Sequence, residues 1–129
     1  MGIRFGRVAI AAVAAEILGI IALVVIVALF GPQERAAAEA YAMRLGMWVG
    51  PISGFVFCLL GGWWVAKRTN RAEVANGFAT GLAAAAIDLT LIVVSGAPFH
   101  QVYVVANAGR IVAGTLGGWF ARRPRVRLA

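Results

Sequence analysis

Residues 45 to 66 read LGMWVGPISGFVFCLLGGWWVA, a run without a single charged side chain. About 20 predominantly apolar residues are enough for one helix to cross the hydrocarbon core of a bilayer. Three further segments of comparable length and apolar character lie on either side of this run, at 8–30, 74–99 and 101–121. The sequence therefore predicts an all-α integral membrane protein with four transmembrane helices.

The composition supports this fold class. Of the 129 residues, 62% are hydrophobic and 13% are charged, whereas about a quarter of the residues in a typical soluble domain are charged. The four segments account for most of the chain, so we expect one transmembrane domain over residues 1–129 and no soluble domain. The first segment ends in bulky Leu29 and Phe30, which favours a retained helix over a removable signal peptide.

The net charge of +7 is concentrated in three places. Basic residues precede the first segment, lie between the second and third, and follow the fourth: Arg4, Arg7, Lys67, Arg68, Arg71, Arg122, Arg123, Arg125 and Arg127. By the positive-inside rule, both termini and the middle loop face the cytoplasm of a multi-pass protein of the cell (inner) membrane. We attribute the basic excess to topology and to contact with anionic lipids, and not to nucleic-acid binding.

The two halves of the sequence resemble one another. The second segment ends Gly61-Gly62-Trp63-Trp64 before basic residues, and the fourth ends Gly117-Gly118-Trp119-Phe120 before basic residues. The first and third segments each place a carboxylate after an alanine run, at Glu16 and Asp88. This pattern is typical of a tandem (2+2) parallel repeat. The alternative is that both endings are a common way to finish a helix at the inner membrane interface.

Small residues recur at every fourth position of the second segment, a pattern often called a glycine zipper, and again in the fourth: Gly46, Gly50, Gly54, Cys58, Gly62, Gly114 and Gly118. Such stripes let helix backbones approach closely in a membrane. They predict packing within a four-helix bundle, and we further expect a homo-oligomer or contact with partner membrane subunits. Pro51 lacks a backbone donor, so a kink beside Ser53 is expected there, either lining a cavity or simply bending the helix.

Glu16, Asp88 and Arg110 are each flanked by at least eight uncharged residues on both sides. A charge at bilayer depth costs at least about 2.5 to 3.5 kcal/mol, so it normally faces a protein interior or a water-filled path. Counted at about 1.5 Å per residue from the cytoplasmic ends of their helices, Asp88 and Arg110 lie at similar depths of roughly 21 and 17 Å. We therefore predict an intramembrane ion pair of Asp88 with Arg110, supported by the polar side chains of Asn107, Thr90 and Ser53.

Glu16 is left without a basic partner in this interpretation. A desolvated carboxyl group without a counter-charge binds a proton or a cation more readily than a paired one. Glu16 is thus the predicted proton or cation site. The alternatives are a neutral, hydrogen-bonded acid and an acid that shares Arg110 with Asp88.

Enzymatic chemistry has little support. The hydroxyl groups of Ser53, Thr80, Thr90 and Ser95 have no nearby histidine or lysine to act as a base. One histidine, His100, and one cysteine, Cys58, do not make a metal site, and we expect no metal and no cofactor. The favoured function is that of an oligomeric transporter or channel-like protein, and the alternative is a non-catalytic subunit or assembly factor of a larger membrane complex.

Overall fold

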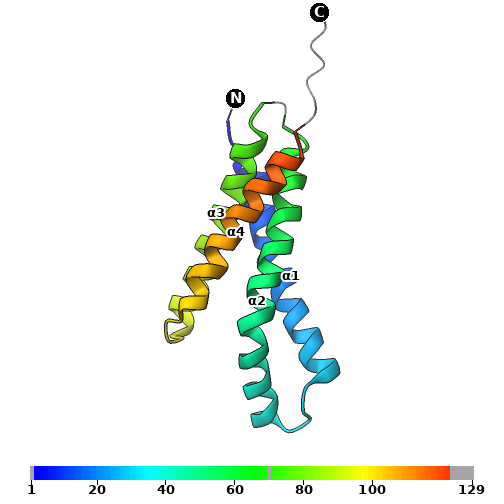
Figure 1. Ribbon diagram of the computed structural model, residues 1–129, viewed down its shortest axis with the longest axis vertical. Helices are drawn as coiled ribbons and strands as arrows, with labels where there is room; N and C mark the ends of the chain where they lie inside the picture. The colour runs from blue at the N-terminus through cyan, green and yellow to red at the C-terminus, as the bar shows by residue number, and fades with distance from the viewer. Residues whose placement is uncertain (1, 70, 123–129) are drawn as a thin grey trace, which may run out of the picture.

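The computed structural model describes residues 2–69 and 71–122, which fold into four α-helices without a β-strand (Figure 1). The helices are α1 (Phe5–Phe30), α2 (Arg35–Ala66), α3 (Glu73–Ser95) and α4 (Gln101–Phe120). By length and composition, α1, α2 and α3 are able to cross a membrane. The all-helical class is confirmed, and the crossing by α4 stays a prediction. Arg123, Arg125 and Arg127, which entered the topology prediction, lie outside the described residues.

Three helix ends differ from the sequence prediction by three residues or more. The first helix begins at Phe5 and not at 8. The second helix begins at Arg35 and not at 45, because the side chain of Glu34 accepts hydrogen bonds from the amides of Ala36 and Ala37 and caps it. The alanine-rich segment before 45 is therefore part of α2, whose length of about 48 Å exceeds a bilayer core of about 30 Å. The third helix ends at Ser95 and not at 99, because Gly96 adopts a left-handed conformation with φ of 66°.

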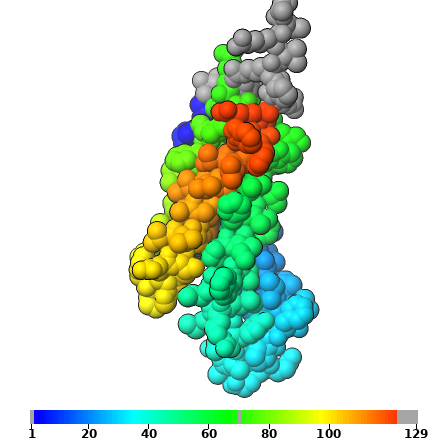
Figure 2. All heavy atoms as spheres, viewed as in Figure 1, coloured from blue at the N-terminus to red at the C-terminus, as the bar shows by residue number. Residues whose placement is uncertain are grey.

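The bundle has a closed end and an open end. The start of α1, the end of α2, the start of α3 and the end of α4 meet at the closed end, at the top of Figure 1. Toward the opposite end, the α1–α2 pair diverges from the α3–α4 pair (Figure 1). Figure 2 shows the resulting notch between the tip of the α3–α4 hairpin and the lower part of α2.

Glycines hold the closed end together. A Cβ atom at Gly62 or Gly77 would collide with the backbone of Gly114, and one at Gly118 would collide with the backbone of Glu73. Between them and the middle of the bundle lies a core of very small side chains: Ala12, Ala15, Cys58, Ala84 and Ala113. These contacts lie within one chain. In this part of the stripes, helix packing inside the bundle therefore occupies Gly62, Gly114 and Gly118.

The other half of the α2 stripe is unpacked. A Cβ atom at Gly46 would meet only Leu23, at 3.7 Å, and one at Gly50 would meet no atom of the described chain within 4 Å. Both glycines line an opening that α2 shares with residues of α1, α3 and α4. The stripe therefore changes its role along α2, from helix packing at the closed end to the wall of an opening at the other end.

Candidate functional site

Arg110 of α4 lies at the centre of a polar cluster in the middle of the bundle. Its Nε donates to Oε1 of Glu16 on α1 at 2.8 Å, and its Nη2 lies 3.3 Å from the second carboxylate oxygen, Oε2. Two parallel bonds of this kind are the strongest arrangement between an arginine and a carboxylate. Glu16 is thus held in a defined orientation by Arg110.

Asp88 of α3 binds the same guanidinium from another side. Nη2 of Arg110 donates to Oδ1 of Asp88 at 3.2 Å, and Nδ2 of Asn107 donates to Oδ2 at 2.8 Å. Asn107 is itself held by a bond from Nδ2 to the carbonyl of Tyr103, one turn earlier in α4. The cluster therefore joins three helices through Glu16, Asp88, Asn107 and Arg110.

The expectation that Glu16 lacks a basic partner is wrong. Matched depth along the helices favoured Asp88 for Arg110, but the guanidinium reaches both carboxylates, and its shortest bond is to Glu16. The two other predicted supporting residues lie outside the cluster. The hydroxyl of Thr90 donates to the carbonyl of Ala86, and that of Ser53 donates to the carbonyl of Gly50.

Gly54 of α2 makes the cluster possible. A Cβ atom at this position would lie 2.9 Å from Cζ and 3.0 Å from Nε of Arg110. α1 and α4 each pack against α2 and α3, so Arg110 reaches Glu16 by passing over α2, where Gly54 leaves it room. The sequence places Gly54 in the packing stripe but does not indicate this second role.

The cluster is buried and carries an unbalanced charge. The side chains of Arg110, Glu16 and Asp88 are 6%, 9% and 20% exposed. With both acids ionised, two negative charges share one positive charge, which leaves one net negative charge. An uncompensated charge at bilayer depth is costly. A proton or a cation at one of the carboxylates would remove that cost.

A crevice of about 490 Å³ connects the cluster with the open end of the bundle. Asp88 and Arg110 lie on its wall, and Gly46, Gly50 and Pro51 contribute the α2 side. Its other lining side chains are mainly apolar or aromatic, among them Leu23, Met43, Met47, Ile92, Val102 and Tyr103. Glu16 does not line it. Of the two carboxylates, Asp88 is thus the one that faces open space.

One polar atom of the cluster has no partner. Oδ1 of Asn107 is buried and accepts no hydrogen bond from the described residues. Rotating the amide by 180° would place this oxygen against two acceptors, Asp88 and the Tyr103 carbonyl, so the orientation with Nδ2 toward both is the favourable one. Buried acceptors of this kind are normally satisfied. Asn107 therefore retains unused hydrogen-bonding capacity beside Asp88.

The composition of the cluster indicates its chemistry. Among the described residues, no group of three His, Cys, Asp or Glu side chains is placed to hold a metal ion. Two carboxylates, one guanidinium and one amide are suited to binding a proton or a monovalent cation and to holding it out of water. Comparison with protein families, with characterised proteins and with solved structures gives no match to this chain.

Proposed function

We propose that this chain is a small transporter or channel-like membrane protein in which Asp88 takes up a proton or a cation. The observation that carries the proposal is the sharing of Arg110 by two carboxylates. The site has one negative charge too many for its surroundings, and binding one positive charge balances it.

Asp88 suits this role better than Glu16 does. Glu16 makes two bonds to Arg110 and lies away from the crevice, whereas Asp88 makes one longer bond to Arg110 and lines the crevice. In this proposal Glu16 fixes the guanidinium, and Asp88 exchanges its bound cation with the crevice. The proton or cation site predicted at Glu16 therefore moves to the other acid of the same cluster.

Movement across the membrane requires a second conformation. The crevice leads to the open end, and the glycine contacts and the alanine core separate the cluster from the closed end. With the predicted topology, the closed end faces the cytoplasm. Release on that side would require the helices to part at Gly62, Gly77 and Gly114.

The predicted tandem repeat would support such a rearrangement, because transporters built from repeats open by rocking one half against the other. The same spacing in the chain separates Gly54 from Arg110 and Gly62 from Gly118. In a two-fold arrangement, equivalent positions of α2 and α4 would face each other. The contact of Arg110 with Gly54 fits this relation, with one side chain filling the space that its equivalent leaves empty.

Flux measurements test the proposal. Wild type, Asp88→Asn and Glu16→Gln are reconstituted into liposomes with matched protein incorporation, and pH-dependent proton or monovalent cation flux is recorded. We expect Asp88→Asn to abolish the protein-dependent flux. Flux in Asp88→Asn equal to that of wild type over the whole pH range would exclude Asp88 as the exchange site.

The alternative is a non-catalytic subunit or assembly factor of a larger membrane complex, and one observation favours it. Trp48 of α2 is 73% exposed. A helix from a second copy or from a partner subunit could pack there. Purification from its native membrane distinguishes the two functions. Recovery only together with other subunits, and no flux when the protein is reconstituted alone in liposomes, would support the accessory role.

A further inference from the structure

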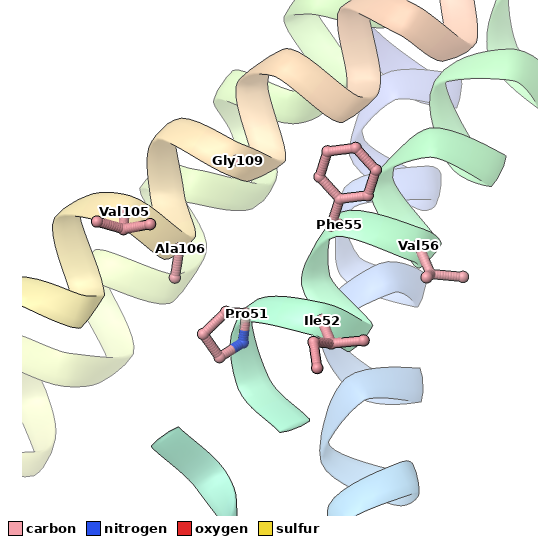
Figure 3. A pocket seen from close by; sticks show the side chains of 7 residues that line it. All are labelled: Pro51, Ile52, Phe55, Val56, Val105, Ala106 and Gly109. Carbon is pink, nitrogen blue, oxygen red and sulfur yellow. The ribbon is translucent and has the colours of Figure 1, made fainter. Parts of the chain in front are cut away.

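A second hollow, of about 300 Å³, lies on the surface between α2 and α4 (Figure 3). Its lining is entirely apolar and includes Pro51, Ile52 and Phe55 from α2 and Val105, Ala106 and Gly109 from α4. Ile52 and Val105 are well exposed on its rim. Because Gly109 and Arg110 are adjacent in α4, this lateral hollow lies at the depth of the charged cluster. With the predicted crossing of α4, hydrocarbon chains of the bilayer surround this hollow.

The lateral hollow and the crevice are neighbours, separated by residues that line both. Pro51 and Ala106 line both of them, and Figure 3 shows the two residues on the facing sides of α2 and α4. Closer to the closed end, Phe55 approaches Gly109, where a Cβ atom would lie 3.8 Å from the phenyl ring. The boundary between the charged crevice and the membrane is therefore formed by one proline ring and one methyl group.

The crevice offers hydrogen-bond acceptors. The Asp88 carboxylate lies on its wall beside Arg110, whose guanidinium is already bound to both acids. Tyr103 and His100 also line the crevice, and each carries a group that can donate or accept. Together with the net negative charge, these acceptors suit a positively charged head that carries N–H donors.

We propose that the crevice and the lateral hollow form one site for a single-chain amphiphile with a protonated primary amine. The ammonium group lies at Asp88, and the hydrocarbon chain passes between Pro51 and Ala106 into the lateral hollow. A hydrocarbon chain fits the lateral hollow better than a partner helix does, because a helix with its side chains is about 10 Å wide. This inference rests on the proposed function and names the chemical class of its ligand.

Binding of three probes tests the inference in lipid nanodiscs, with the heat from empty nanodiscs subtracted. Decylammonium has both head and chain, methylammonium has the head alone, and 1-decanol has the chain alone. We expect saturable binding of decylammonium that is lost in Asp88→Asn. Methylammonium should bind to the same aspartate at least about tenfold more weakly, and 1-decanol should show no saturable binding.

Variants of α4 distinguish binding of the hydrocarbon chain from binding of the ammonium group. Gly109→Leu fills the lateral hollow and should weaken decylammonium binding about tenfold while leaving methylammonium unchanged. Ala108→Leu, next to it but outside both hollows, is the matched control and should change neither. Val105→Trp blocks the hollow from its exposed rim without altering the contact of Phe55 with Gly109, so it serves if Gly109→Leu folds poorly.

The outcomes distinguish this inference from the proposed function. Equal affinity for decylammonium and methylammonium, or decylammonium binding unaffected by both hollow-filling variants, would overturn the two-part site. Methylammonium binding that still depends on Asp88 would then leave the proposed cation site intact. Failure of both amines to bind, together with unchanged flux in Asp88→Asn, would reject both.

Discussion

At the residue scale, one absent side chain determines the polar cluster. The side chain of Arg110 reaches both acids because position 54 carries no Cβ atom in its path. Helix positions are often occupied by glycine to let backbones approach, but here the glycine accommodates a guanidinium. The orientation of Arg110, and with it the pairing of Glu16, depends on that space.

Gly54→Ala should therefore destabilise the protein. The new methyl group would lie 2.9 Å from Cζ of Arg110 and force the guanidinium away from Glu16, which we expect to cost about 1 to 3 kcal/mol of unfolding free energy. Gly50→Ala, one turn away and in open space, should be neutral or stabilising by up to about 1 kcal/mol. Unfolding in mixed detergent micelles measures both, and equal effects would show that Gly54 has no special relation to Arg110.

Arg110 should matter more to stability than either acid. Arg110→Gln leaves two buried carboxylates without a counter-charge and should cost about 3 to 5 kcal/mol. Asp88→Asn leaves a balanced pair of Glu16 with Arg110 and should cost less than about 1 kcal/mol. The same unfolding assay compares them, and a larger loss in Asp88→Asn than in Arg110→Gln would contradict the shared-arginine arrangement.

The residues of the site and the contact of Asp88 with Arg110 could be predicted from the sequence, but not the shorter bond of Arg110 to Glu16. Isolated charges in apolar segments identify Glu16, Asp88 and Arg110, because such charges are costly wherever they point. Depth along a helix, however, gives no information on which helices are neighbours or how far a side chain reaches sideways. Glu16 and Arg110 come together through α2, at a position that the sequence shows only as one glycine in a stripe.

At the element scale, α2 combines a rigid half and an open half. From Gly54 to Gly62 it is packed by Arg110 and the backbone of α4, whereas Gly46, Gly50 and Pro51 border the crevice. Pro51 stands at the change between the two. A backbone carbonyl without its donor is tolerated in a membrane where it faces a cavity, which accounts for a proline at this point of the helix.

Pro51→Ala should restore the missing bond to Met47 and reduce local opening of α2. We expect slower amide hydrogen exchange around residues 47–53 in the variant, while exchange at the glycine-packed closed end stays the same. Unchanged exchange at 47–53 would show that Pro51 does not loosen this turn.

The helices themselves were predictable to a useful degree. Long apolar runs predicted all four, and the starts of α3 and α4 agree to within one residue. The beginning of α2 was not predictable from hydrophobicity, because the polar and alanine-rich turns after Glu34 extend beyond the apolar run and are stabilised by capping and by the ion pair of Arg35 with Glu39.

At the scale of the whole molecule, the separation of the two helix pairs was not predictable. The same glycine spacing occurs at both ends of α2, yet only one end is closed by backbone contacts from α3 and α4. At the closed end, Gly62 of α2 lies against the backbone of Gly114 on α4. The crevice lies beside two glycines of α2 that have no such partner, and the lateral hollow lies beside Pro51, Ala106 and Gly109.

The orientation in the membrane is testable by itself. Reporter fusions after Ala129 and within 67–71 should report a cytoplasmic location, and one at Glu39 should report an external location, because the basic residues gather at the closed end. These results would place the crevice mouth outside. An external reading after Ala129 would reverse the direction in which the crevice opens.

Exchange of a proton or a cation at Asp88, and not at Glu16, can be tested directly. Infrared difference spectra between acidic and alkaline buffer record the carbonyl stretching band of a protonated carboxyl group directly in membranes. We expect part of the pH-dependent band of wild type to be lost in Asp88→Asn, and the band to be weaker in Glu16→Gln, where Arg110 balances the charge of Asp88 alone. Glu34, Glu39 and Glu73 contribute in the same way to all three spectra. A band in Asp88→Asn equal to that of wild type would contradict exchange at Asp88.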